Sequence, residues 1–206
     1  MAYDRDPAVY APELAPALQQ RWSPRALDSE HQLSDQQLRL LLAAARWAPS
    51  AGNGQPWAFL VGRRGTPVFE TIVDAASRGN TAWIPRASVL LASVAKTGPS
   101  PEQPTDDWEP WHYYDLGQSV AHLTVQAHEL GLHVHQFAGF RHADVAAALG
   151  VPAGWRVMTG IAVGVLGDAT TLDEITRAKE QLPRTRKPLT DFVFEGAWGR
   201  PASWAQ

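Results

Sequence analysis

The 206-residue sequence contains no cysteine and no long apolar run. The absence of cysteine excludes disulfide bonds, thiolate metal sites, iron–sulfur clusters and a cysteine nucleophile. The longest apolar stretches, at residues 89–95 and 161–166, are too short to span a bilayer. The N-terminal residues include acids and prolines, so they do not read as a signal peptide. We therefore expect a cytoplasmic protein with no membrane partner.

The chain also lacks a large excess of charge of either sign. Its formal net charge is −3 and its pI is about 6.1, so no overall positive field attracts nucleic acid. Hydrophobic residues make up 45% of the chain and charged residues 19%, a composition typical of folded globular proteins. The length favours one domain over residues 1–206, with an N-terminal arm at 1–20 and a C-terminal extension at 182–206.

Hydrophobic periodicity predicts six helices and four strands. The clearest helix begins at a capping box of Ser34 and Gln37 and ends before Pro49. The helices are expected at residues 13–20, 34–47, 66–77, 115–130, 142–149 and 171–181, and the strands at 57–62, 88–96, 132–137 and 157–166. A helix precedes the first strand, and no glycine-rich turn joins that strand to a helix. This order favours an α+β domain with a mixed central sheet.

Arg21, Ser23 and Arg25 alternate in a loop interrupted by proline. In an extended stretch alternate side chains project to one side, so two guanidinium groups and a hydroxyl could meet one ligand. Arginine offers several planar donors that suit a phosphate. A solvated basic loop is the alternative interpretation of this segment.

Residues 49–57, with the sequence PSAGNGQPW, have the composition of a loop. Gly52 and Gly54 allow the backbone to approach a flat ligand, and the amides of Asn53 and Gln55 both donate and accept hydrogen bonds. Such groups suit the alternating donors and acceptors at the edge of an isoalloxazine ring. The alternative is a plain turn between a helix and a strand, but a turn does not need two amides.

Arg184, Arg186 and Lys187 place three cations within four positions near the C-terminus. Such a cluster could close on a phosphate, but a solvated tail or a non-specific nucleic-acid patch also explains it. The short run and the net negative charge of the chain argue against nucleic acid.

Nine tryptophans and seven histidines are further candidates. Most of the tryptophans are expected in the core or in an interface, but Trp57, Trp83 and Trp111 lie beside loops and could stack on a flat ligand. Trp108 and Trp111 also belong to a loop predicted at residues 97–111, which we expect to influence the choice of substrate. His133 and His135 would point the same way from a strand and could be two metal ligands. We favour partly buried or interface histidines over metal ligands, and we predict no metal site.

Taken in order, these segments resemble the FMN-dependent nitroreductase family. RWSPR at 21–25, APSAGNGQPW at 48–57 and RTRKPL at 184–189 follow the order of that family's motifs. NTAWIPRA at 80–87 precedes a buried strand as the family's asparagine-containing segment does, DLG at 115–117 opens a long helix, and FAGF at 137–140 is similar to a Gly-Gly-Phe turn. The resemblance extends from about residue 20 to residue 198.

The resemblance implies roles for individual residues in binding flavin mononucleotide (FMN). The loop segment and the terminal basic pair would hold the phosphate and the pyrimidine edge through Arg21, Trp22, Ser23, Arg25, Arg184 and Arg186. Asn80 would lie near the polar edge of the flavin, and Ala138 and Gly139 would bring backbone groups to the central ring and its N5 atom. The partner subunit would line the flavin through Pro49, Ser50, Ala51, Asn53 and Gln55.

The resemblance further implies an obligate homodimer with two flavins at its interface and a C-terminal extension that packs on the partner subunit. The flavin would pass hydride from NADH or NADPH to a nitroaromatic, a quinone or a similar small acceptor in a ping-pong reaction. No side chain would act as a dedicated catalyst, because the flavin carries the chemistry and the protein tunes it. An FMN-dependent oxidase or dehydrogenase and a non-enzymatic flavin-binding protein are the alternatives.

This sequence departs from the family at several positions. His133, His135 and Gln136 replace small or apolar residues, and Ala138 stands where some members have glutamate. Trp83 occupies a position where some members have a basic residue. The resemblance therefore does not imply a particular substrate or a preference between NADH and NADPH.

Overall fold

The computed structural model describes residues 14–98 and 109–205. Residues 1–13 of the expected N-terminal arm and Trp108 lie outside the described residues, as does most of the loop predicted at 97–111. One compact unit ends at Glu180, and the residues from Gln181 onward belong to a second unit. The assignment of the whole chain to a single domain stays a prediction. No helix within the described ranges has the length and apolar character needed to cross a membrane.

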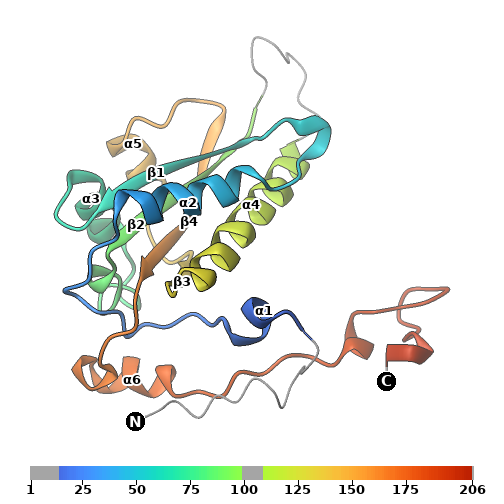
Figure 1. Ribbon diagram of the computed structural model, residues 1–206. Helices are drawn as coiled ribbons and strands as arrows, with labels where there is room; N and C mark the ends of the chain where they lie inside the picture. The colour runs from blue at the N-terminus through green and yellow to red at the C-terminus, as the bar shows by residue number, and fades with distance from the viewer. Residues whose placement is uncertain (1–13, 99–108, 206) are drawn as a thin grey trace. The chain divides into compact units, whose positions relative to one another are not determined.

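A four-stranded sheet forms the centre of the larger unit, in the order β1-β2-β4-β3 (Figure 1). The strands are β1 (Trp57–Arg63), β2 (Val89–Lys96), β3 (His133–Phe137) and β4 (Trp155–Gly164). The α+β class is confirmed, but the mixed sheet is wrong for the described strands, because all three strand pairs are antiparallel. Strands β2 and β3 do run parallel to each other, since both are antiparallel to β4. They form no parallel pair because β4 lies between them.

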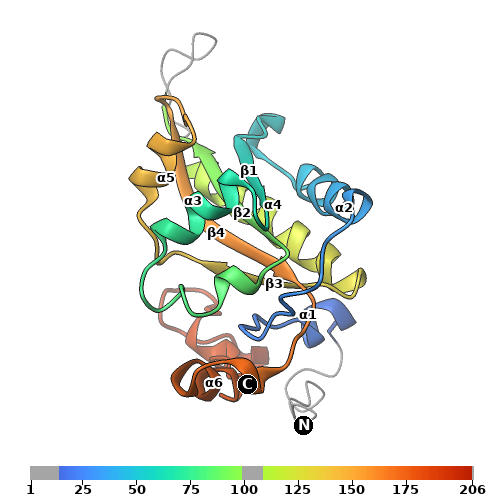
Figure 2. The same ribbon diagram turned by 90° about the vertical axis from the view of Figure 1, so that its left-hand side faces the viewer.

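Helices cover both faces of this sheet (Figures 1 and 2). Helices α2 (Asp35–Arg46) and α4 (Glu109–Glu129) pack on one face, whereas α3 (Pro67–Ala75) and α5 (His142–Ala148) pack on the other. Neighbouring residues of β2 alternate between the two cores, as Leu90 and Leu91 illustrate. The remaining helices of the larger unit are α1 (Pro16–Gln20), which contacts α4, and α6 (Glu174–Glu180).

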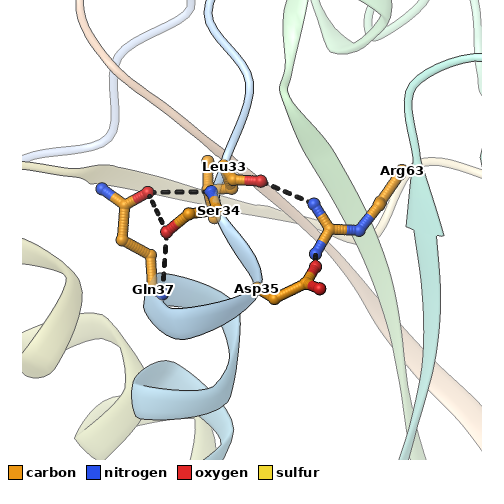
Figure 3. A network of polar contacts seen from close by, with 5 residues as sticks. All are labelled: Leu33, Ser34, Asp35, Gln37 and Arg63. Atoms are coloured by element: carbon orange, nitrogen blue, oxygen red, sulfur yellow. Dashed lines mark hydrogen bonds and ion pairs between the residues drawn. The ribbon is translucent and has the colours of Figure 1, made fainter.

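The predicted start of α2 is confirmed, and it is anchored to the end of β1 (Figure 3). The Ser34 hydroxyl accepts a hydrogen bond from the Gln37 amide at 3.2 Å, and the Gln37 side chain accepts one from the Ser34 amide at 2.9 Å. Arg63 donates to the carbonyl of Leu33 and forms an ion pair with Asp35. An acid in the first turn of a helix also favours the helix dipole.

Helices α4 and α6 begin at positions different from those predicted. Helix α4 begins at Glu109, six residues before Asp115, because a proline in the first turn, here Pro110, fits a helix without loss of a hydrogen bond. Helix α6 begins at Glu174, since a separate 3₁₀ turn (Ala169–Thr171), capped by Asp168, occupies the residues before it. The other predicted helices and strands of the larger unit are confirmed with small differences at their ends.

The close approach of α3 to β1 depends on Gly62. A Cβ atom at this position would lie 2.4 Å from the backbone nitrogen of Phe69. We expect Gly62→Ala to lower the free energy of unfolding by about 1–3 kcal/mol, because the helix backbone must move off the strand. Urea denaturation measures this change.

Gly117→Ala is the matched control for this prediction. Gly117 is exposed on α4, and a Cβ atom there would meet nothing within 4 Å. Because alanine favours a helix more than glycine does, this change should raise the free energy of unfolding by about 0.5–1 kcal/mol. Changes of the same sign in both variants would contradict the packing argument.

Candidate functional site

Residues 21–28 form an irregular segment that is held through its backbone. The side chain of Glu180, at the end of α6, is 1% exposed and accepts hydrogen bonds from the amides of Arg25 at 2.9 Å and Ala26 at 3.4 Å. The amide of Gly167 donates to the carbonyl of Ala26 at 2.8 Å. These contacts fix the path of the segment without using the side chains of its arginines.

The polar side chains of the segment provide donors for an anion. The Arg21 guanidinium donates to the Ser23 hydroxyl at 3.1 Å, so these two predicted site residues lie together. The Arg25 guanidinium is half-buried and forms no hydrogen bond or ion pair within the described part of the chain. Two guanidinium groups and a hydroxyl within five residues form a donor set that suits a phosphate.

His135 on β3 joins this segment to the core. Its Nδ1 atom donates to the carbonyl of Pro24 at 3.0 Å, and its ring stacks on Trp83 with the centroids 4.2 Å apart. Trp83 is 0% exposed. The expectation that Trp83 stacks on a ligand is therefore wrong, because its loop folds over β3 and encloses the ring. Trp57 is half-buried against the α2–α4 core and Trp111 is exposed.

Asn80 extends the same network to the turn at residues 138–139. Its side-chain carbonyl accepts a hydrogen bond from the Trp83 indole at 3.2 Å, and its amide donates to the carbonyl of Gly139 at 2.9 Å. A Cβ atom on Gly139 would lie 2.6 Å from the Ser77 hydroxyl, so glycine permits this close approach. The Arg21–Arg25 segment, Asn80 and the Ala138–Gly139 turn thus belong to one connected structure.

The segment at residues 49–55 adopts a strained conformation. It contains a short 3₁₀ turn (Ala51–Asn53), and both Asn53 and Gln55 have positive φ angles, of 56° and 48°. Residues other than glycine rarely adopt such angles, and those that do often lie at functional sites. The turn is fixed by hydrogen bonds from the Gln55 amide to the Ser50 hydroxyl and from the Ala51 amide to Asp115, both at 3.0 Å.

Two of the predicted groups of site residues lie at opposite ends of α4 in one chain (Figure 1). Ala51 contacts Asp115 near the start of this helix, and Gln20 contacts His128 near its end. With a rise of 1.5 Å per residue, Asp115 and His128 are about 20 Å apart along the helix. A single chain therefore does not bring residues 49–55 to the Arg21–Arg25 segment.

The C-terminal basic pair belongs to the second unit. Arg184 is half-buried, and Arg186 is exposed and donates to the carbonyl of Thr185 at 2.7 Å. The expected meeting of this pair with Arg21 on a phosphate stays a prediction.

Sequence reasoning missed Glu180 and Ser77 as supports of the site. Glu180 appears in the sequence as an ordinary charged residue in the last turn of a helix, more than 150 residues from Arg25. Ser77 acts through its backbone amide, which donates to the carbonyl of Gly139 at 2.8 Å. Hydrogen bonds to distant backbone groups leave no local pattern, so nothing in the sequence indicates either residue.

The two histidines of β3 are held in their neutral form. Burial, and to a smaller extent the nearby His128, lowers the pKa of His133 from 6.5 to about 4. Burial also lowers the pKa of His135 to about 4; the contact with Pro24 raises it, and the charges of Arg25 and Arg21 lower it. Within the described ranges, no three histidines, cysteines or carboxylates gather as metal ligands.

These pKa values predict that the protein loses stability in acid. Above pH 6.5 the histidines are neutral in both the folded and the unfolded chain. Between pH 6.5 and 4 the unfolded chain takes up protons that the folded chain refuses, so the free energy of unfolding falls as the pH falls. His135 should account for a loss on the order of 3 kcal/mol.

His135→Asn tests this assignment, because asparagine keeps an amide donor near the position of Nδ1 but does not titrate. The slope of the unfolding free energy against pH, measured by urea denaturation from pH 7 to pH 4, should become smaller in this variant. An unchanged slope would show that His135 does not cause the loss.

The sequence is similar to those of known proteins. The model of the nitroreductase family matches residues 18–66 and 63–165. An uncharacterised 15.4 kDa protein of Mycolicibacterium smegmatis is 35% identical over 153 residues, which are 69% of this chain and 98% of that protein. A protein of Archaeoglobus fulgidus, whose name proposes NADH dehydrogenase or NAD(P)H nitroreductase activity, is 32% identical over 104 residues, 50% of this chain and 55% of that protein.

Solved structures show the same fold. The crystal structure of an oxidoreductase containing FMN superimposes with a TM-score of 0.82 at 34% identity and covers 91% of this chain and 93% of its own. A structure from Desulfovibrio desulfuricans solved in complex with FMN gives a TM-score of 0.70 at 24% identity, with coverage of 88% and 95%. Since the family model spans well over half of the sequence, this chain belongs to the nitroreductase family.

Proposed function

We propose that the protein is an FMN-dependent oxidoreductase that takes hydride from NADH or NADPH and passes it to a small acceptor such as a nitroaromatic or a quinone. The observation that carries this proposal is the network that joins the Arg21–Arg25 segment to Asn80 and Gly139. The FMN-containing relative supports the cofactor. The name of the Archaeoglobus fulgidus relative supports the nicotinamide donor.

The residues of the network fit the chemistry of FMN. Its phosphate needs several donors, which Arg21, Ser23 and Arg25 would provide. The turn at Ala138 and Gly139, which Ser77 and Asn80 hold in place, would present backbone groups to its flat ring. When bound, FMN supplies reversible hydride transfer, so the protein needs no dedicated acid or base.

We also propose that the protein acts as a homodimer with shared sites. Residues 49–55 lie far along α4 from the Arg21–Arg25 segment of their own chain, so a second copy would bring them to the cofactor. Exposed aromatic residues just after α2 and near the start of α4 support an interface there. Trp47 is 78% exposed, Trp111 56% and Tyr114 64%. The C-terminal extension, in which Trp198 and Trp204 are exposed, would pack on the partner subunit.

The purified protein should take up FMN and be bleached by NADH or NADPH in the absence of oxygen. The yellow colour should return when a nitroaromatic or a quinone is added, and absorbance at the flavin band measures both steps. A protein that binds FMN but is not bleached would be a flavin carrier and not this enzyme. One that binds no FMN would contradict the whole proposal.

Arg25→Ala should raise the dissociation constant of FMN by about 10-fold to 100-fold, the effect of losing charge-assisted hydrogen bonds. Arg25→Lys keeps the charge but loses the planar set of donors, so its effect should be smaller. Flavin fluorescence titration measures both constants. Equal affinities of the wild type and Arg25→Ala would remove Arg25 from the site.

Mixed dimers test whether each site is shared. Arg25→Ala and Asn53→Gly each impair both sites of a homodimer, and glycine tolerates the positive φ angle at position 53. Random exchange of subunits between the two variants should restore about a quarter of the sites, because each mixed dimer contains one site with Arg25 and Asn53 intact. Flavin content after exchange measures the recovery. No recovery would mean that each site draws on one chain.

A further inference from the structure

A row of three histidines lies against the Arg21–Arg25 segment and the residue before it, Gln20. One comes from the end of α4 and two come from β3, the edge strand of the sheet. Every second residue of the stretch 20–24 contacts one of them. The pairs are Gln20 with His128, Trp22 with His133, and Pro24 with His135.

The three contacts differ in kind, but each joins a histidine of α4 or β3 to a residue of the stretch 20–24. At one end the Nε2 atom of His128 lies 3.3 Å from the side-chain oxygen of Gln20. In the middle the ring of His133 meets Trp22 edge to face, with the centroids 6.3 Å apart. At the other end His135 donates to a backbone carbonyl, which depends on the path of the chain and not on the identity of the residue. The row therefore sets which residues of the segment meet the sheet.

The residues between these contacts are the ones that carry donors for an anion. Arg21 and Ser23 are hydrogen-bonded to each other, and Arg25 follows at the same spacing. A slip of one residue would place Arg21 or Ser23 at His133, where Trp22 now packs. Glu180 fixes the segment just after the row, through the amides of Arg25 and Ala26.

We propose that His128, His133 and His135 are positioning residues that set the register of residues 20–25 and so hold Arg21, Ser23 and Arg25 as a preformed receptor for the phosphate of FMN. This inference rests on the proposed function, since the ligand is FMN. A receptor that is ordered before binding does not spend binding energy on ordering its own loop. The row should therefore affect the affinity for the phosphate and leave the affinity for the ring unchanged.

Replacement of His135 separates its hydrogen bond from its packing. His135→Phe keeps a ring against Trp83 but removes the donor to Pro24, and should raise the dissociation constant of FMN about fivefold to tenfold. The dissociation constant of riboflavin, which lacks the phosphate, should not change. His135→Asn keeps a donor near Nδ1 and should restore most of the affinity for FMN. Fluorescence titration of both flavins measures these values.

A double variant gives a second readout that does not need riboflavin. In an Arg25→Ala background the receptor is already incomplete, so His135→Phe should weaken FMN binding much less than it does in the wild type. If His135→Phe does not fold, His128→Leu takes its place, because His128 is at the more exposed end of the row. That variant should show the same selective effect on FMN, at about twofold to threefold.

The outcomes separate the two proposals. A wild type that binds neither flavin would contradict the proposed function. A wild type that binds FMN, with variants that weaken FMN and riboflavin equally or that add fully to Arg25→Ala, would overturn the positioning role. Equal FMN affinity in the wild type and His135→Phe would overturn it as well.

Discussion

The hydrogen bond between His135 and the carbonyl of Pro24 joins an irregular loop to a rigid sheet, and the candidate site depends on that connection. Fixing the backbone of one residue costs about 1–2 kcal/mol of conformational entropy. The segment at 21–28 has no helix or strand of its own to offset this cost. Contacts from β3, from Glu180 and from Gly167 do so instead. The loop can thus present its arginines in one arrangement before any ligand arrives.

Within the described residues, no carboxylate of the protein forms an ion pair with the Arg25 guanidinium of this loop. The carboxylate of Glu180 accepts hydrogen bonds from backbone amides, and His135 stays neutral near Arg21 and Arg25. A protonated histidine there would repel the guanidinium groups, and a second carboxylate would compete with an anionic ligand. A neutral imidazole supplies a hydrogen-bond donor and an apolar face, and it neither repels the guanidinium groups nor competes with an anionic ligand.

Much of the fold could be predicted from the sequence, because its signals are local. The capping box at Ser34 and the apolar stripes of the helices depend on neighbours a few residues apart. The order of the strands depends on pairing between distant residues, and no periodicity reveals it. The early start of α4 was missed because residues 97–111 are rich in proline and acidic residues and therefore predict a loop. The candidate arginines and amides could be identified from their types and order, but Trp83 was misjudged because its burial depends on how its loop folds over β3.

The insertion of β4 between β2 and β3 has a consequence for synthesis on the ribosome. Among the described strands, β3 hydrogen-bonds to β4 alone, and β4 is the last of them to emerge. Until residues 155–164 have left the exit tunnel, β3 has no strand to pair with. Its histidines are therefore not yet held on a fixed backbone. The nascent chain must therefore keep the edge of β2 exposed through the synthesis of two helices, a period in which non-local sheets are prone to aggregate. This exposure follows from the order of the strands and not from any property of the finished site.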